Sequence, residues 1–188
     1  MGRVVVSQFV TVDGVFEDPG GSEGHERGAW AFQFDRGDEG NKFKLDEVMA
    51  SDALLLGRVT YEGFAAAWPS RDGEFADKFN GMQKYVVSTL GEPEWNNTAV
   101  VTVDDVSRLR DTRGGDILVN GSAQLVAELL ERDLVDELRL MVFPTVLGSG
   151  RRLFGDTSVP KAFRLVESRA VGPDGVTILT YQPVTREG

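Results

Sequence analysis

Residues 53–68 read ALLLGRVTYEGFAAAW, and this stretch decides the fold of the chain. Its first half, ALLLG, is a short apolar run that ends on Gly57, which is typical of a strand buried on both faces of a parallel sheet. Its second half, residues 58–68, predicts a helix that Pro69 ends. A buried strand that turns through a glycine into a helix predicts an α/β fold.

A second stretch has the same construction. Residues 116–133 read DILVNGSAQLVAELLERD, in which a short apolar strand stops at Gly121 and a helix follows. The apolar residues of this helix fall on one face: Leu125, Val126, Leu129 and Leu130. Both turns would leave unpaired backbone N–H groups, and the positive end of a helix dipole, at the carboxyl edge of the sheet. Ligands bind at this edge in open α/β sheets.

The rest of the chain completes one α/β domain over residues 1–188. Further strands are expected at residues 3–12, 83–90, 98–102, 135–148, 161–171 and 176–184. Helices are expected at residues 41–52 and 104–112, a short charged helix or loop at 72–81, and a long loop at 13–40. This order predicts three layers, with helices on both faces of a mixed, mainly parallel sheet and a C-terminal antiparallel hairpin.

Composition and charge narrow the possible functions. A chain of 188 residues is long enough to bury a core without covalent cross-links. Its net charge of −10 argues against nucleic acid and anionic membrane surfaces as partners, since both need a basic footprint. The absence of cysteine excludes disulfides and thiolate ligands, and a single histidine, His25, cannot build a histidine metal site. We therefore expect a cytoplasmic protein that uses no metal ion and acts on a small molecule.

The residues at the strand ends can hold an anion. Arg58 and Thr60 add a cation and a donor at the first glycine turn, and Ser122 adds a hydroxyl at the second. A third strand ends at the Ser88–Thr89 pair. Together these features predict a site for a long, multiply phosphorylated molecule. Taken singly, each also fits an ordinary helix cap, a strand-to-loop transition or, for Arg58, a surface residue after a tight turn.

Five segments carry a resemblance to a known family. They are SQFVTVDG (7–14), LLLGRVTYEGF (54–64), KYVVSTL (84–90), DILVNGSAQLVAELLERDLVDEL (116–138) and FPTVLGSGRRLF (143–154). In this order they resemble the dihydrofolate-reductase-like reductases, and most of all the C-terminal reductase domain of the bifunctional riboflavin-biosynthesis proteins (RibD). The resemblance covers residues 4 to about 183. The zinc deaminase half of those proteins needs cysteine ligands, so the chain resembles a standalone member of the family.

The resemblance implies NADPH as the hydride donor, lying across the carboxyl edge of the sheet. The cofactor-binding residues that it implies are Gly57, Arg58, Thr60, Ser88, Thr89, Asn120, Gly121, Ser122 and Ala123. Asn120 stands where dihydrofolate reductases have the first glycine of a pair. The residues implied on the nicotinamide and substrate side are Val12, Asp13, Gly14, Pro144, Gly148 and Gly150.

Two further candidates for the substrate side come from the residues themselves. Arg151 would hold a substrate phosphate if the substrate is a ribose phosphate, and otherwise it lies on a solvated turn. Trp30, with Phe32 and Phe34, forms either a stacking wall for a flat heterocycle or a patch that folds over the core.

The reaction that the resemblance implies is reduction of a C=N or C=O bond in a small heterocycle or a ribosylaminopyrimidine-like molecule. The cofactor would supply the hydride, and Asp13 or water would complete the proton transfer. The helix at 41–52 also offers two carboxylates, Asp46 and Glu47. Arg58, together with the lack of an acidic residue at these strand ends, predicts a preference for NADPH over NADH.

Two other functions fit the same sequence: a non-catalytic nucleotide-binding or sensing module, and a structural oligomer whose strand ends bind nothing. We also expect a homodimer. This expectation rests partly on the resemblance and partly on residues 135–143, which carry apolar side chains on both faces of a strand.

Overall fold

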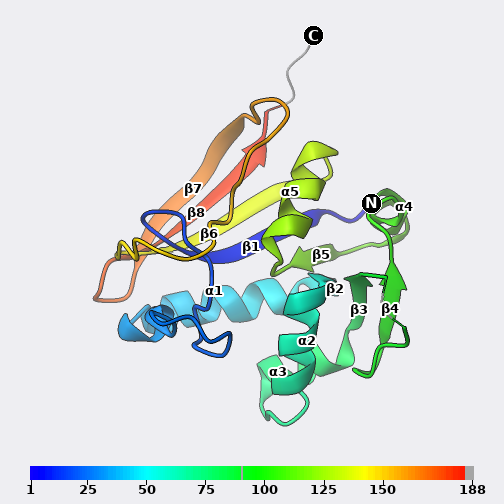
Figure 1. The fold of residues 1–188 in the computed structure, drawn as a ribbon, viewed down its shortest axis with the longest axis horizontal. Coiled ribbons are helices and arrows are strands. Elements are labelled where there is room, and N and C mark those ends of the chain that lie inside the picture. The colour runs from blue at the N-terminus through cyan, green and yellow to red at the C-terminus, as the bar shows by residue number, and fades with distance from the viewer. Residues whose placement is uncertain (90, 185–188) are drawn as a thin grey trace.

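The structure, a computed structural model, describes residues 1–89 and 91–184 (Figure 1). The described strands form one sheet in the order β4-β3-β2-β5-β1-β6-β8-β7. The strands are β1 (Val4–Thr11), β2 (Ser51–Gly57), β3 (Gln83–Val87), β4 (Thr98–Val101), β5 (Asp116–Val119), β6 (Glu137–Phe143), β7 (Phe163–Val171) and β8 (Val176–Pro183). The helices are η1 (Trp30–Gln33), α1 (Gly37–Met49), α2 (Arg58–Ala67), α3 (Glu74–Gly81), α4 (Asp105–Thr112) and α5 (Ala123–Glu131).

The sheet has a parallel part and an antiparallel part. Strands β4, β3, β2, β5, β1 and β6 pair in parallel, in that order. Strand β8 pairs antiparallel with both β6 and β7, so β7 forms one outer edge of the sheet. The mixed, mainly parallel sheet and its C-terminal hairpin are therefore confirmed.

Helices cover both faces of the parallel part. Because strand side chains alternate between faces, Leu55 packs into a core with α4 and α5, whereas Leu54 and Leu56 pack into another core with α1, α2 and α3. Figure 1 shows α5 on one side of the sheet and α1 and α2 on the other. The apolar run of β2 is fully buried because both of its faces are covered. The predicted three layers are confirmed.

Helix α1 and strand β6 have other limits than the sequence predicts. Helix α1 begins at Gly37 rather than at residue 41, so the long loop ends earlier than expected. Asp38 and Glu39 in its first turn suit the positive end of the helix dipole, a start signal that the surrounding glycines hide. Strand β6 ends at Phe143 rather than at residue 148, because Pro144 has no N–H group to continue the ladder.

Among the described residues, no helix is both long enough and apolar enough to span a lipid bilayer.

Candidate functional site

The two glycine turns meet at the carboxyl edge of the sheet. Strands β2 and β5 are neighbours, and α2 and α5 leave their carboxyl ends onto opposite faces. The Gly57 N–H donates a hydrogen bond to the Gly121 carbonyl over 3.0 Å, which joins the two turns directly. Two helix N-termini that diverge from adjacent strands form the kind of crevice in which α/β proteins bind ligands. The favourable partner of these N-termini is an anion.

Only glycine fits at both turns. A Cβ atom on Gly57 would collide with the Ser122 hydroxyl, and one on Gly121 would lie 2.7 Å from the Thr60 hydroxyl. Gly121 also has a φ of +122°, which other residues rarely adopt, and its peptide bond to Ser122 is cis. The absence of side chains at these two positions therefore keeps the backbone N–H groups of the edge close to any ligand.

The serine and alanine that follow Gly121 begin helix α5. Ser122 is the N-cap, and its hydroxyl oxygen accepts a hydrogen bond from the Leu125 N–H over 3.4 Å. Its hydroxyl proton is not used in this bond and can be donated to a ligand. Ala123 is the first helical residue, so its N–H group points out of the helix end.

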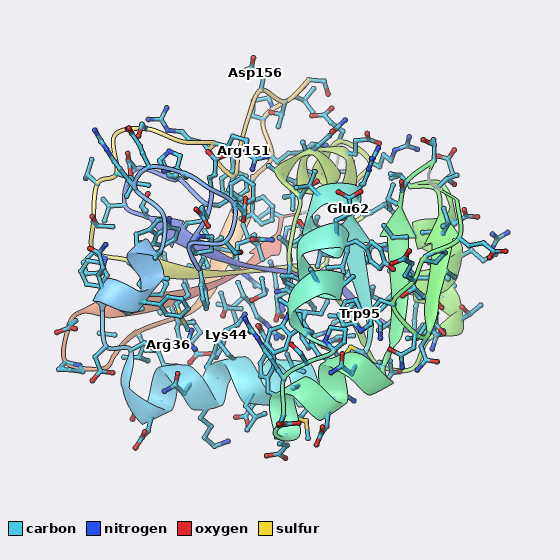
Figure 2. The ribbon with its side chains drawn as sticks, turned by 60° about the horizontal axis from the view of Figure 1, so that its bottom comes forward. Arg36, Lys44, Glu62, Trp95, Arg151 and Asp156 are labelled. Atoms are coloured by element: carbon cyan, nitrogen blue, oxygen red, sulfur yellow. The ribbon has the colours of Figure 1, made fainter. Side chains whose placement is uncertain are left out.

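The cation of the site lies at the start of helix α2. Arg58 is its first residue, and the Nε atom donates to the Glu62 carboxylate over 2.9 Å. Both side chains are about half exposed, at 57% and 51%. Figure 2 shows Glu62 on this helix. The exposed guanidinium can approach an anion bound at the turns.

The third strand end lies beside the first. Val87, the last residue of β3, is the partner of Gly57 in the parallel ladder, so Ser88 and Thr89 follow directly next to the Gly57 turn. The predicted strand over residues 83–90 thus ends earlier, at Val87, and residue 90 lies outside the described residues.

Asn120 is the exception among the predicted cofactor residues. Its side-chain NH₂ group donates to the Ser7 carbonyl of β1 over 3.1 Å. Its Oδ1 atom is buried and has no hydrogen-bond partner among the described residues. The side chain is therefore turned toward β1, and the other residues predicted to bind the cofactor gather along the ends of β3, β2 and β5.

Asp13 anchors a loop. Its carboxylate accepts hydrogen bonds from the Thr11 hydroxyl over 2.5 Å, the Leu147 N–H over 3.1 Å and the Gly148 N–H over 2.9 Å. These donors, with Thr11 first, lower the pKa of Asp13 to about 2. A carboxylate that is ionised and bonded in this way is a poor proton donor near neutral pH, so the geometry argues against the predicted catalytic role of Asp13.

The substrate-side loops are tied to each other. The Val12 N–H donates to the Thr145 carbonyl, and the Phe16 N–H donates to the Arg151 carbonyl. The predicted substrate-side residues on these loops are Val12, Gly14, Pro144, Gly148 and Gly150, and all of them are half-buried or exposed. The two loops therefore form one wall at the β1 and β6 end of the edge.

The charge of Arg151 is already balanced within this wall. Its guanidinium contacts Glu17 at 3.0 Å and Glu23 at 3.1 Å. The backbone N–H of Arg151 lowers the pKa of Glu17, which favours the ionised carboxylate. Two glutamates therefore compete with any substrate phosphate for Arg151, and the predicted phosphate contact is not favoured by this arrangement.

Trp30 lies in the core. Its side chain is 1% exposed, packs edge-on against Phe143 at 5.4 Å between ring centroids, and donates its Nε1–H to the Glu17 carbonyl. No face of the ring is open to a heterocycle, so a stacking role for Trp30 is wrong, and the alternative of a patch that folds over the core holds for this residue. Phe32, in contrast, is 79% exposed.

A buried polar cluster lies between helix α1 and strand β1. The Glu47 side chain is 1% exposed, and its Oε1 atom accepts hydrogen bonds from the Ser7 hydroxyl over 2.9 Å and from the Lys44 ammonium. Its Oε2 atom is buried, has no hydrogen bond among the described residues, and lies 3.5 Å from the Arg139 guanidinium. We call Ser7, Lys44 and Glu47 the floor cluster.

Two cations, the N-cap residue of helix α1 and a residue within that helix, lie over the same ring. Arg36 and Lys44 each lie 5.2 Å from the centroid of the Phe9 ring in β1, and Figure 2 shows both between α1 and the sheet. Asp46, the other carboxylate considered from the sequence, is exposed and pairs with Lys42. The sequence did not separate Glu47 from Asp46. The spacing of Gly40, Lys44 and Glu47 on one side of the helix is the signal that could have done so.

In the described part of the chain, no group of three or more histidine, cysteine or carboxylate side chains is arranged to hold a metal ion.

The sheet and the helices on its two faces have the dihydrofolate-reductase-like fold. A dihydrofolate reductase from Enterococcus faecalis, solved with NADP(H), superposes with a TM-score of 0.64 at 16% identity and 96% coverage of both chains. A proposed riboflavin biosynthesis protein from Shewanella sp. PV-4 superposes with a TM-score of 0.78 at 22% identity, covering 97% of this chain and 99% of that one. At these identities the likeness concerns the fold.

The sequence comparison gives the family. The model of the RibD C-terminal domain matches residues 3–177, so the chain belongs to the RibD C-terminal domain family, as the sequence motifs predicted. The uncharacterized protein YyaP of Bacillus subtilis (strain 168) is 28% identical over 188 residues, which cover 95% of this chain and 94% of YyaP. The family supports a reductase-type function.

Proposed function

We propose that the protein is an NADPH-dependent reductase that transfers a hydride to a small heterocyclic or ribosylaminopyrimidine-like molecule. The observation that carries the proposal is the pair of interlocked glycine turns at β2 and β5, with Arg58 exposed beside them. Two helix N-termini and a cation suit the several phosphates of a dinucleotide. Membership of the RibD C-terminal domain family supports the same chemistry.

Each part of the edge has a role in this proposal. The N-terminal N–H groups of α2 and α5, with the Ser122 hydroxyl, would bind the pyrophosphate, because they carry the positive ends of two helix dipoles. Arg58, with Ser88 and Thr89, would bind the ribose 2′-phosphate. When bound, the cofactor would supply the hydride, and the protein would supply orientation and electrostatics.

The substrate would lie between the loop wall and the floor cluster. A C=N or C=O group that accepts a hydride needs a proton at its nitrogen or oxygen. Asp13 is ionised and bonded to the opposite loop, so this proton would come from water or from Lys44, which already donates to Ser7 and Glu47. A solved structure from Thermotoga maritima, whose name includes 5-amino-6-(5-phosphoribosylamino)uracil reductase, superposes with a TM-score of 0.65 at 18% identity, covering 97% of this chain and 57% of that one. It suggests the first substrate to try.

The experiment has two stages. Calorimetry measures NADPH binding to the protein and to Gly121→Val and Gly63→Ala variants. We expect NADPH to bind, Gly121→Val to lose binding because its side chain meets Thr60, and Gly63→Ala to retain it because its Cβ would point into open space. Loss of NADPH absorbance is then followed with pterins, aminopyrimidines and the ribosylaminouracil.

The outcomes separate the alternatives. Binding with oxidation supports the reductase. Binding without oxidation of NADPH by any of these molecules would favour a sensing module, and a flat titration would favour a structural role for the edge.

A further inference from the structure

Arg58 occupies an unfavourable place for a cation. It is the first residue of α2, and the first turn of this helix contains no acidic side chain. The N-terminus of a helix is the positive end of its dipole, so a guanidinium there does not help the helix. A residue that breaks a local rule in this way points to a role in binding rather than in stability.

Glu62 contacts this guanidinium in a specific manner. One turn further along α2, its carboxylate accepts from Nε of Arg58 over 2.9 Å. Among the described residues, this is the one hydrogen bond that the Arg58 side chain makes, so both terminal amino groups remain available. The sequence order of the pair, with the cation before the carboxylate, is the weaker arrangement for helix stability. The contact therefore orients the Arg58 guanidinium more than it stabilises helix α2.

The surroundings of Glu62 define the side from which an anion can approach. Glu62, Glu92 and Glu94 line a groove of about 650 Å³ between α2 and residues 91–96, together with Ala65 and Val86. A phosphate that came through this groove would meet three carboxylates. On the side of the strand ends it would meet Thr60 and the two helix N-termini instead, so the negative groove favours the approach over the edge.

We propose that Glu62 is a positioning residue for cofactor specificity. It holds Arg58 through Nε so that both terminal amino groups are presented to the 2′-phosphate of NADPH. An arginine fork that is already ordered loses less conformational entropy when it makes a bidentate phosphate contact. This inference rests on the proposed function, because it assumes that Arg58 meets the 2′-phosphate.

The test distinguishes the effect of orienting the Arg58 side chain from the effect of the negative charge of Glu62. Glu62→Ala removes the acceptor for Nε, whereas Glu62→Gln keeps an acceptor oxygen and removes only the charge. We expect Glu62→Ala to weaken NADPH about threefold to tenfold, the effect of releasing one long side chain. We expect NADH to change by less than about twofold, because it has no phosphate at this position. Glu62→Gln should restore most of the NADPH affinity.

Two controls accompany these variants. Glu94→Ala removes a carboxylate from the same groove, and no contact between Glu94 and Arg58 is present in the described part of the chain. It should change NADPH binding less than Glu62→Ala does. The two single variants and the double variant form a double-mutant cycle. In the Arg58→Ala background, Glu62→Ala should not change the affinity for NADPH. Calorimetry with NADPH, NADH and adenosine 2′,5′-bisphosphate measures binding, and thermal melting checks that every variant is folded.

Each contrary outcome has one meaning. If Glu62→Ala binds NADPH more tightly, Glu62 competes with the phosphate and the positioning role is wrong. The positioning role is also wrong if Glu62→Gln binds NADPH as weakly as Glu62→Ala does. It is wrong too if Arg58→Ala weakens NADPH more than NADH while Glu62→Ala changes neither. If the unmodified protein binds neither cofactor, or if Arg58→Ala affects both equally, the proposed cofactor site itself is overturned.

Discussion

At the scale of single residues, Arg58 has the features that we expect of a side chain that binds a ligand rather than one that stabilises the fold. It is exposed, it stands at the wrong end of a helix dipole, and its partner leaves part of the guanidinium open. The sequence already indicated Arg58 as a candidate, because a cation directly after a buried strand and a glycine does not contribute to the apolar core.

Replacing Arg58 by Ala should weaken NADPH and leave NADH nearly unchanged. A charge-assisted hydrogen bond contributes about 1.5–3 kcal/mol, which corresponds to about 10- to 150-fold in affinity. The melting temperature should stay equal or rise slightly, because a cation is removed from the positive end of α2. Calorimetry and thermal melting measure the two effects. Equal weakening of both cofactors would mean that Arg58 does not recognise the 2′-phosphate.

Asp13 should act through stability rather than through catalysis. Its pKa falls from 3.8 to about 2 in the folded protein, so the carboxylate stabilises the fold fully above about pH 4, and this contribution is lost as the pH falls toward 2. Asp13→Asn should therefore lower the free energy of unfolding at neutral pH, and its difference from the unmodified protein should shrink between pH 4 and 2. Urea unfolding at a series of pH values measures this. A difference that stays constant down to pH 2 would contradict the assignment.

At the scale of elements, the strand–helix units followed from local signals. Strands β2 and β5 are apolar runs that end near glycine, and the helices after them begin within a few residues. Local signals therefore predicted both the carboxyl edge where the two glycine turns meet and the three layers of the fold. The features that the sequence did not predict are contacts between residues far apart in the chain. Trp30 is buried because the loop folds over Phe143, and Arg151 is neutralised by Glu17, which lies 134 residues earlier. No local pattern contains such pairs.

The floor cluster should hold helix α1 against β1. Glu47→Ala would leave the Lys44 ammonium and the Ser7 hydroxyl without their buried carboxylate acceptor, and breaking a buried ion pair in this way costs about 3–5 kcal/mol. Glu47→Gln keeps an acceptor for Ser7 and should cost less. Chemical denaturation measures both variants, and Asp46→Ala, on the exposed side of α1, is the matched control. If Glu47→Ala and Asp46→Ala lower the free energy of unfolding by similar amounts, the floor cluster does not stabilise the fold.

At the scale of the whole molecule, the expected dimer needs a different argument from the one the sequence suggested. Strand β6 lies between β1 and β8, and its Leu138, Met141 and Phe143 are already buried in the monomer. Two neighbouring apolar residues are exposed on the outer strand β7 instead: Leu165 is 49% and Val166 is 51% exposed. Strand β7 shifts register against β8 between Leu165 and Glu167, so the two apolar side chains lie uncovered where the outer strand is irregular.

We propose that a second copy of the chain covers β7. Light scattering at tens of micromolar should then give twice the monomer mass of 20.6 kDa. Leu165→Lys should reduce this to the monomer mass without loss of the fold, whereas Val59→Lys, at an exposed apolar position on α2, should leave the dimer intact. A monomer mass for the unmodified protein would rule out the dimer.

The bond between Asp13 and Gly148 joins residues that are 135 positions apart, and this sets an order of events during synthesis. Both glycine turns are complete once residue 123 has left the ribosome. The first loop, by contrast, has no anchor until the segment after β6 emerges. A nascent chain that has emerged from the ribosome as far as residue 140 would therefore already contain both glycine turns, while proteases could still cut the loop that follows β1.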